Sequence, residues 1–132
     1  LLDLGAVRTL NRDEDYVSEI GANNVDVVID LVAGPKWPSL LDLLRPGGRY
    51  AVAGAIGGPM VELDIRTLYL KDLSFFGCTV LEPDVFGNLV GRIERKEILP
   101  LVAETYPLRE IKDAQDAFGK KGHVGKIVLE VS

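Results

Sequence analysis

The stretch Val25-Asp26-Val27-Val28-Ile29-Asp30-Leu31-Val32 constrains the fold more than any other part of this sequence. It is almost continuously aliphatic, and most of its residues are β-branched. Such a run predicts a strand that is buried on both faces, as in the interior of a parallel sheet. Because other layers must then cover both faces, the run indicates an α/β fold.

Glycine and proline divide the rest of the chain into short segments that alternate between strand and helix patterns. Strands are predicted at residues 6–10, 25–32, 49–55, 73–80, 101–106 and 127–131. Helices are predicted at residues 1–4 (a last turn), 13–20, 37–44, 65–69 (a single turn), 84–95 and 111–118. This order predicts a doubly wound parallel sheet. The β-α-β run after residue 97 has no evident place in that sheet and is expected to be a separate piece.

Composition excludes several classes of protein. The 132 residues have a net charge of −5, which argues against a nucleic-acid or anionic-membrane partner. No apolar run approaches the roughly 20 residues needed to span a bilayer. The single cysteine rules out an intrachain disulfide, so a reducing, cytoplasmic location is expected.

The familiar catalytic and phosphate-binding motifs are missing from the sequence. No G-x-G-x-x-G follows a strand, and the stretch 122–126 lacks the spacer and the Ser/Thr of a P-loop. One cysteine and one histidine cannot build a structural zinc site, and no Ser-His-Asp set is convincing. Cys78 lies in an apolar strand and is predicted to be buried and inert. His123, in a turn rich in glycine and lysine, is predicted to be exposed.

Open α/β sheets bind ligands beyond the carboxyl ends of their strands, which here fall at residues 30–34, 53–58 and 78–81. The second stretch is small throughout, so a flat ligand or another backbone could approach it closely. From the pattern alone, a simple glycine-rich turn after a strand is the more common explanation. Asp30 could orient a ligand or cap the loop that follows it. Lys126 could direct a point charge at a phosphate or belong to a solvated turn.

Taken together, the segments resemble the C-terminal part of the medium-chain dehydrogenase/reductase superfamily, the group of zinc-type alcohol dehydrogenases and quinone oxidoreductases. The matching stretches, in family order, are Leu4-Gly5-Ala6, Val25-Asp26-Val27-Val28-Ile29-Asp30, Leu44-Arg45-Pro46-Gly47-Gly48-Arg49, Val52-Ala53-Gly54, Phe76-Gly77, Pro107-Leu108 with Ala114 and Phe118, and Gly125-Lys126-Ile127-Val128-Leu129. Each stretch is weak alone, but their order and spacing together are specific to the superfamily.

The resemblance implies a partial Rossmann sheet, of family strand order 3-2-1-4-5-6. Residues 1–97 would hold strands 3 to 6 and lack strands 1 and 2, and residues 98–132 would return to the catalytic domain. The family's zinc ligands and proton-relay residues would lie outside this chain, which therefore holds no expected catalytic or metal-binding residue. The residues expected to bind NAD or NADP are Leu31, Val32, Ala53, Gly54, Ala55, Cys78, Thr79, Val80 and Lys126.

The parent enzyme would transfer hydride between nicotinamide and a small alcohol, carbonyl or quinone, with zinc as a possible second cofactor. The chain alone is expected to be inactive. It is also expected to self-associate, through the strand at 73–80 or through the sheet edge left without strand 1. A non-catalytic α/β binding or interaction module is the alternative, while a short-chain reductase or methyltransferase half fits the motif order less well.

Overall fold

The computed structural model describes residues 1–79 and 82–131, which form two compact units, Leu1–Val80 and Leu81–Ser132. Each unit is described by itself. Val80, one of the residues expected to bind the cofactor, lies outside the described residues. The domain boundary predicted between residues 97 and 98 concerns the division between cofactor-binding and catalytic domains in the parent, and it stays a prediction.

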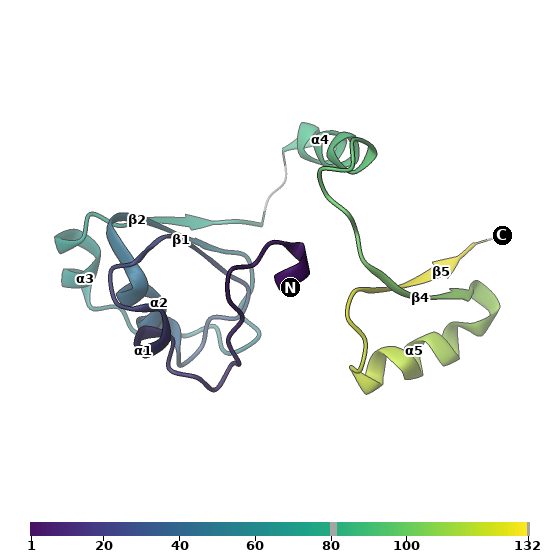
Figure 1. The fold of residues 1–132 in the computed structure, drawn as a ribbon, viewed down its shortest axis with the longest axis horizontal. Coiled ribbons are helices and arrows are strands. Elements are labelled where there is room, and N and C mark those ends of the chain that lie inside the picture. The colour runs from purple at the N-terminus through teal and green to yellow at the C-terminus, as the bar shows by residue number, and fades with distance from the viewer. Residues whose placement is uncertain (80–81, 132) are drawn as a thin grey trace. The chain divides into compact units, whose positions relative to one another are not determined.

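The first unit is built on a three-stranded parallel sheet with the strand order β1-β2-β3 (Figure 1). The strands are β1 (Val25–Asp30), β2 (Leu44–Val52) and β3 (Ser74–Gly77). Helix α2 (Trp37–Leu43) connects the first pair and α3 (Ile65–Leu70) the second. The strands predicted at residues 25–32, 49–55 and 73–80, and the helices predicted between them, are therefore confirmed, although β2 begins earlier, at Leu44. Each strand lies beside the next one in the sequence.

Local capping signals set the helix boundaries. Helix α1 (Tyr16–Ile20) begins where the Asp15 side chain accepts hydrogen bonds from the amides of Val17 and Ser18. Helix α2 carries Pro38 in its first turn, where a missing amide hydrogen costs nothing. The 3-10 helix η1 (Leu2–Leu4) ends at Gly5, whose φ of 96° closes the turn.

The strand predicted at residues 6–10 is wrong, because this segment is irregular and pairs with no strand in the described part of the chain. The hydrophobic pattern is present, but a strand needs a neighbour to satisfy its backbone groups.

The core lies on one face of the sheet only. Its buried residues are Trp37, Leu41, Leu44, Tyr50 and Leu73, with Leu68 of α3 packed against them. Helices α2 and α3 lie on the same face of the sheet (Figure 1). This follows because parallel β-α-β connections share one handedness and both connections here lead to the next strand in the same direction across the sheet.

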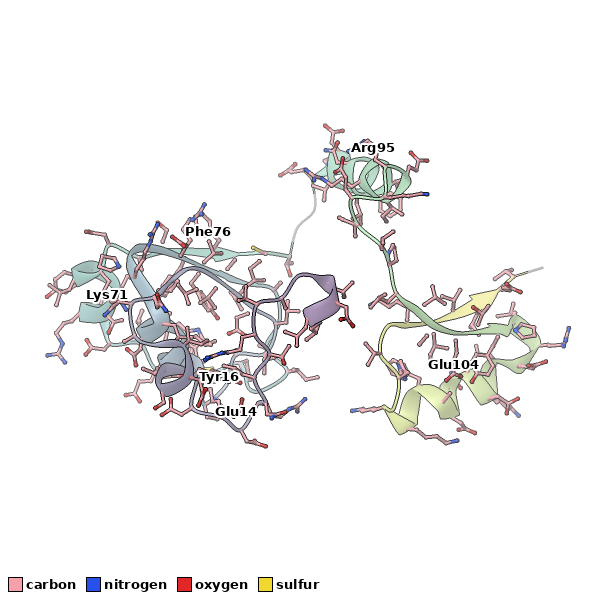
Figure 2. The ribbon with its side chains drawn as sticks, viewed as in Figure 1. Glu14, Tyr16, Lys71, Phe76, Arg95 and Glu104 are labelled. Atoms are coloured by element: carbon pink, nitrogen blue, oxygen red, sulfur yellow. The ribbon has the colours of Figure 1, made fainter. Side chains whose placement is uncertain are left out.

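The expectation that the 25–32 strand is buried on both faces is therefore wrong. Ile29 is 74% exposed. In the register of the sheet Ile29 lies opposite Ala51, which lies opposite Phe76. Phe76 is 50% exposed and lies on the side of the sheet away from α2 (Figure 2).

The second unit contains a parallel two-stranded sheet of β4 (Val102–Pro107) and β5 (Lys126–Glu130). The 3-10 helix η2 (Leu108–Glu110) and helix α5 (Ile111–Lys120) connect the two strands, and Ala114 of α5 is buried. Helix α4 (Pro83–Glu94) precedes them. The separate β-α-β piece predicted after residue 97 is thus confirmed as a sheet of its own. Among the described residues, no helix is both long and apolar enough to cross a bilayer.

Candidate functional site

Backbone hydrogen bonds between the residues that follow β2 and β3 and the last residues of the neighbouring strands hold the carboxyl ends of the three strands together. The Ala53 amide donates to the Asp30 carbonyl oxygen at 2.9 Å, and the Cys78 amide donates to that of Val52 at 2.8 Å. The parallel ladder therefore continues past the last strand residues, and the three chain ends leave the sheet at one common edge.

A cavity of about 420 Å³ lies at the ends of β2 and β3. Its lining residues are Val52, Ala53, Gly54, Ala55, Gly77, Cys78 and Thr79. The structure thus brings together five of the nine residues predicted to bind the cofactor, and none of the seven lining side chains is larger than valine. Small side chains on two neighbouring strand ends leave space for a flat ligand at the edge where open α/β sheets bind theirs.

The loop after β1 touches the loop after β2 backbone to backbone. The Gly57 amide donates to the Val32 carbonyl oxygen at 2.7 Å. A Cβ atom at Gly54 would lie 2.5 Å from the Leu31 carbonyl oxygen, and one at Gly34 would lie 2.4 Å from that of Gly57. The sequence leaves open whether a ligand or a backbone approaches the stretch 53–58, and at Gly54 it is a backbone.

Leu31 and Val32 themselves lie in this loop contact and do not line the cavity. Their side chains are exposed, 61% and 52% respectively. They are therefore available to a ligand that extends from the cavity across the end of β1.

Asp30 caps the loop that follows β1, which decides between the two roles that the sequence allowed. Its Oδ1 atom accepts hydrogen bonds from the amides of Val32 (2.8 Å) and Ala33 (2.9 Å). Its Oδ2 atom accepts a hydrogen bond from the Tyr50 hydroxyl at 2.7 Å, and that hydroxyl accepts one from Trp37 Nε1 at 2.8 Å. All three side chains are buried, and Asp30 is only 5% exposed.

This network shifts both titratable groups. Burial raises the pKa of Asp30, but the hydrogen bonds from the Ala33 amide, the Tyr50 hydroxyl and the Val32 amide outweigh burial and hold it below the ordinary value. Burial, together with the hydrogen bond to Asp30, raises the pKa of Tyr50 to about 12. At neutral pH the aspartate is therefore ionised and the tyrosine protonated. The sequence does not identify Trp37 and Tyr50 as members of this hydrogen-bond network, because hydrophobic patterning treats both only as residues of the core.

Two expectations about single residues are wrong. Cys78 is exposed rather than buried, because β3 ends at Gly77 and the cysteine lies beyond it in the cavity wall. His123 is half-buried rather than exposed, since its ring packs against Phe118 with the centroids 5.7 Å apart. Its Nδ1 atom is buried and has no hydrogen-bond partner among the described residues.

Lys126 begins β5 in the second unit and is exposed, and its amide donates to the Leu101 carbonyl oxygen at 2.8 Å. Its role at a cofactor stays a prediction. Within residues 1–79 and 82–131, no group of three or more His, Cys, Asp or Glu residues is placed to hold a metal ion.

Residues 4–129 match the sequence family of zinc-binding dehydrogenases. Among curated proteins, the chain is 29% identical over 141 residues to quinone oxidoreductase of Rattus norvegicus, an alignment that covers 98% of this chain and 42% of that protein. It is 32% identical over 117 residues to acryloyl-coenzyme A reductase of Metallosphaera sedula, with 86% of this chain and 35% of that protein covered. The chain thus spans about two fifths of the length of the curated relatives it matches.

Solved structures give the same picture. A protein of Sinorhizobium meliloti 1021 assigned as an alcohol dehydrogenase is 44% identical, with a TM-score of 0.83 over 98% of this chain and 38% of that one. A thermostable alcohol dehydrogenase of Pyrobaculum aerophilum, solved with cobalt and zinc bound, is 30% identical, with a TM-score of 0.77 over 98% of this chain and 38% of that one. The predicted α/β class, a parallel sheet of Rossmann type, is confirmed by these likenesses.

Proposed function

The chain belongs to the zinc-binding dehydrogenases, an oxidoreductase family within the medium-chain dehydrogenases/reductases, and we propose that it contributes part of an NAD(P)-binding site. In this proposal the cavity at the ends of β2 and β3 receives the nicotinamide end of the cofactor. Leu31 and Val32 line the adenosine side, and Val80 and Lys126 complete the set carried over from the family resemblance.

The observation that carries the proposal is the cavity itself. It lies at the carboxyl edge of a parallel sheet, and its lining combines Ala53, Gly54 and Ala55 from one strand end with Cys78 and Thr79 from the next. The surface of this wall is mostly apolar, and its small side chains let a ligand lie close to the backbone. A planar ring with a carboxamide group fits a wall of this kind by stacking on it and hydrogen-bonding to its backbone.

In the proposed reaction, bound nicotinamide supplies or accepts the hydride that is exchanged with a small alcohol, carbonyl or quinone. The residues of this chain bind and orient the ring, and the exposed apolar side chains of Leu31 and Val32 contact the adenosine portion. As the family resemblance implies, the Lys126 ammonium would attract the pyrophosphate as a point charge. We assign no acid, base or zinc ligand to this chain, so we expect the chain alone to be inactive.

We further propose that the protein is a cytoplasmic homo-oligomer. The support for association is the pair of open sheet edges: β1 and β3 are the outer strands of their sheet, and all four residues of β3 are exposed. The support for a reducing compartment is the exposed thiol of the only cysteine. Sedimentation at increasing protein concentration tests association, and a monomer throughout would contradict it.

Titration of the ¹⁵N-labelled chain with NADH and with NADPH tests the cofactor site. Only part of the cofactor's contacts is present, so we expect a dissociation constant no tighter than about 1 mM, corresponding to roughly −4 kcal/mol. Amide shifts should be confined to the proposed site, at residues 31–32, 53–55, 78–80 and 126. Their absence up to ~10 mM, or their concentration elsewhere, would contradict the proposal.

A matched pair of variants sharpens this test. Ala53→Leu fills the cavity and should abolish the shifts, whereas Ala22→Leu, in an exposed turn outside the cavity, should leave them unchanged. Equal effects of both variants would show that the shifts do not report on the cavity. An activity assay with NADPH and a quinone should give no turnover for the chain alone.

A further inference from the structure

Three buried side chains from three different elements form a continuous hydrogen-bonded relay, Trp37 to Tyr50 to Asp30. We propose that this relay positions the loop after β1 against the loop after β2, and so sets the shape of the wall on which a dinucleotide lies. Asp30 and Tyr50 are then positioning residues rather than ligands of the cofactor. This inference rests on the proposed cofactor site.

The direction of every hydrogen bond in the relay is fixed. Trp37 Nε1 can only donate, so the Tyr50 oxygen accepts from it at 2.8 Å. The single hydroxyl hydrogen of Tyr50 is then directed at Asp30 Oδ2, which lies 2.7 Å away. Because Trp37 and Asp30 are each 5% exposed and Tyr50 is 2% exposed, water cannot replace either bond.

The other carboxylate oxygen holds the loop in a shape that its sequence does not favour. Ala33 has a φ of 54°, in the left-handed region that a non-glycine residue rarely adopts. Its amide, together with that of Val32, donates to Asp30 Oδ1. The charged acceptor therefore stabilises a strained turn, and Tyr50 fixes the orientation of that acceptor from the opposite side.

The turn after β1 in its turn determines where the loop after β2 lies. The Val32 carbonyl oxygen accepts a hydrogen bond from the Gly57 amide, and the Leu31 carbonyl oxygen lies only 2.5 Å from where a Cβ atom of Gly54 would be. Gly54 lines the cavity, so a change in the first loop displaces the cavity wall. The relay is thus coupled to the cavity through backbone contacts alone, with no side chain of the relay in the cavity lining.

Amide hydrogen exchange of Tyr50→Phe tests the positioning step. This variant keeps the ring that packs between Trp37 and Phe75 and removes only the hydroxyl. We expect exchange at Val32, Ala33 and Gly57 to become at least ~10-fold faster, with a smaller change at the sheet amide of Val28. A uniform acceleration throughout the first unit, or no change in the loops, would overturn the inference.

Matched variants separate the relay from general effects. Tyr69→Phe, at a tyrosine that is 60% exposed, should leave loop exchange unchanged. Asp30→Asn retains an oxygen that can accept from both loop amides, so its loop should exchange more slowly than that of Asp30→Ala. If the asparagine variant gave no such rescue, Oδ1 would not be holding the loop and the inference would fail.

Titration of Tyr50→Phe with NADH distinguishes this inference from the proposed function. We expect the dissociation constant to rise severalfold over that of the unsubstituted chain. If the unsubstituted chain and Tyr50→Phe bound NADH equally, the relay would have no positioning role although the cofactor site would stand. If the unsubstituted chain bound no NADH, the proposed cofactor site would be wrong. The proposal that the relay positions the wall of that site would then also be wrong, whatever the hydrogen-exchange rates showed.

Discussion

The α-carbon of Gly54 lies so close to the Leu31 carbonyl oxygen that a Cβ atom at Gly54 would be 2.5 Å from that oxygen. No real Cβ atom tolerates this separation, and the obstacle is backbone rather than the end of a flexible side chain. Replacing Gly54 by any other residue must therefore move one of the two loops at the carboxyl edge of the sheet.

We predict that Gly54→Ala lowers the free energy of unfolding by about 1–3 kcal/mol, the usual range for overpacking a site that cannot relax. Gly77→Ala is the matched control, because it lines the same cavity and its Cβ would meet no atom within 4 Å. Urea unfolding of both variants measures the difference. Equal losses would show that the two loops are not in the close contact described.

The ionised form of Asp30 is predicted to stabilise the fold in a pH-dependent way. Its folded pKa is lowered, so its contribution is present above the unfolded pKa of about 3.9 and is lost as the pH falls through the folded value. The stability difference between the unsubstituted protein and Asp30→Asn should therefore be constant near neutral pH and shrink below pH ~4. Urea unfolding at a series of pH values measures it, and a difference independent of pH would contradict the prediction.

Tyr50 should ionise only at strongly alkaline pH. Its folded pKa of about 12 lies above the ordinary value, so the stability that it contributes is intact below pH ~10 and is lost as the pH rises through about 12. The phenolate absorbance of the unsubstituted protein minus that of Tyr50→Phe should titrate near 12. In urea the same difference should titrate near the ordinary value of about 10. A native difference that titrates near 10 would show that the hydroxyl is not held by Asp30.

Cys78 should react with a thiol reagent in the native protein. It is exposed in the wall of the cavity and is the only cysteine of the chain, so labelling reports on this wall alone. We expect the native rate to be comparable to the rate in urea, whereas a buried thiol would react ~10³-fold or more slowly through unfolding. Such protection would contradict the exposed position.

Elements with local signals could be predicted from the sequence. Asp15, Pro38 and Gly5 stop or start helices through contacts within a few residues, and the helices near them are found as expected. The pairing of consecutive strands also follows from the alternation of strand and helix patterns. The strand at residues 6–10 could not be judged in this way, because whether it forms depends on a neighbour that is distant in the sequence.

The candidate site was predicted in part, for the same physical reason. The small residues at 53–58 mark the cavity, and the carboxyl ends of parallel strands must meet at one edge, which brings residues 78 and 79 beside them. The sequence does not predict the relay, because Asp30, Trp37 and Tyr50 come together only when β1, α2 and β2 have packed as one crossover unit. Apolar patterning also reveals neither hydroxyl nor indole hydrogen bonds. The prediction for Cys78 is wrong because its burial depends on where β3 stops. The prediction for His123 is wrong because its ring packs against Phe118 of α5, a contact that the turn sequence does not reveal.

Trp37 is the only tryptophan of the chain, and it lies at the start of the relay with Tyr50 and Phe75 in edge-on contact with its ring. Excitation at the long-wavelength end of the absorption band, where only tryptophan absorbs, therefore gives fluorescence from Trp37 alone. This fluorescence reports on the interior of the first unit. Unfolding of residues 82–131 gives no tryptophan signal of its own, while circular dichroism records the helices and strands of both units. A temperature gap between the two optical transitions would reveal whether the two halves of the chain melt as one cooperative block or as separate ones.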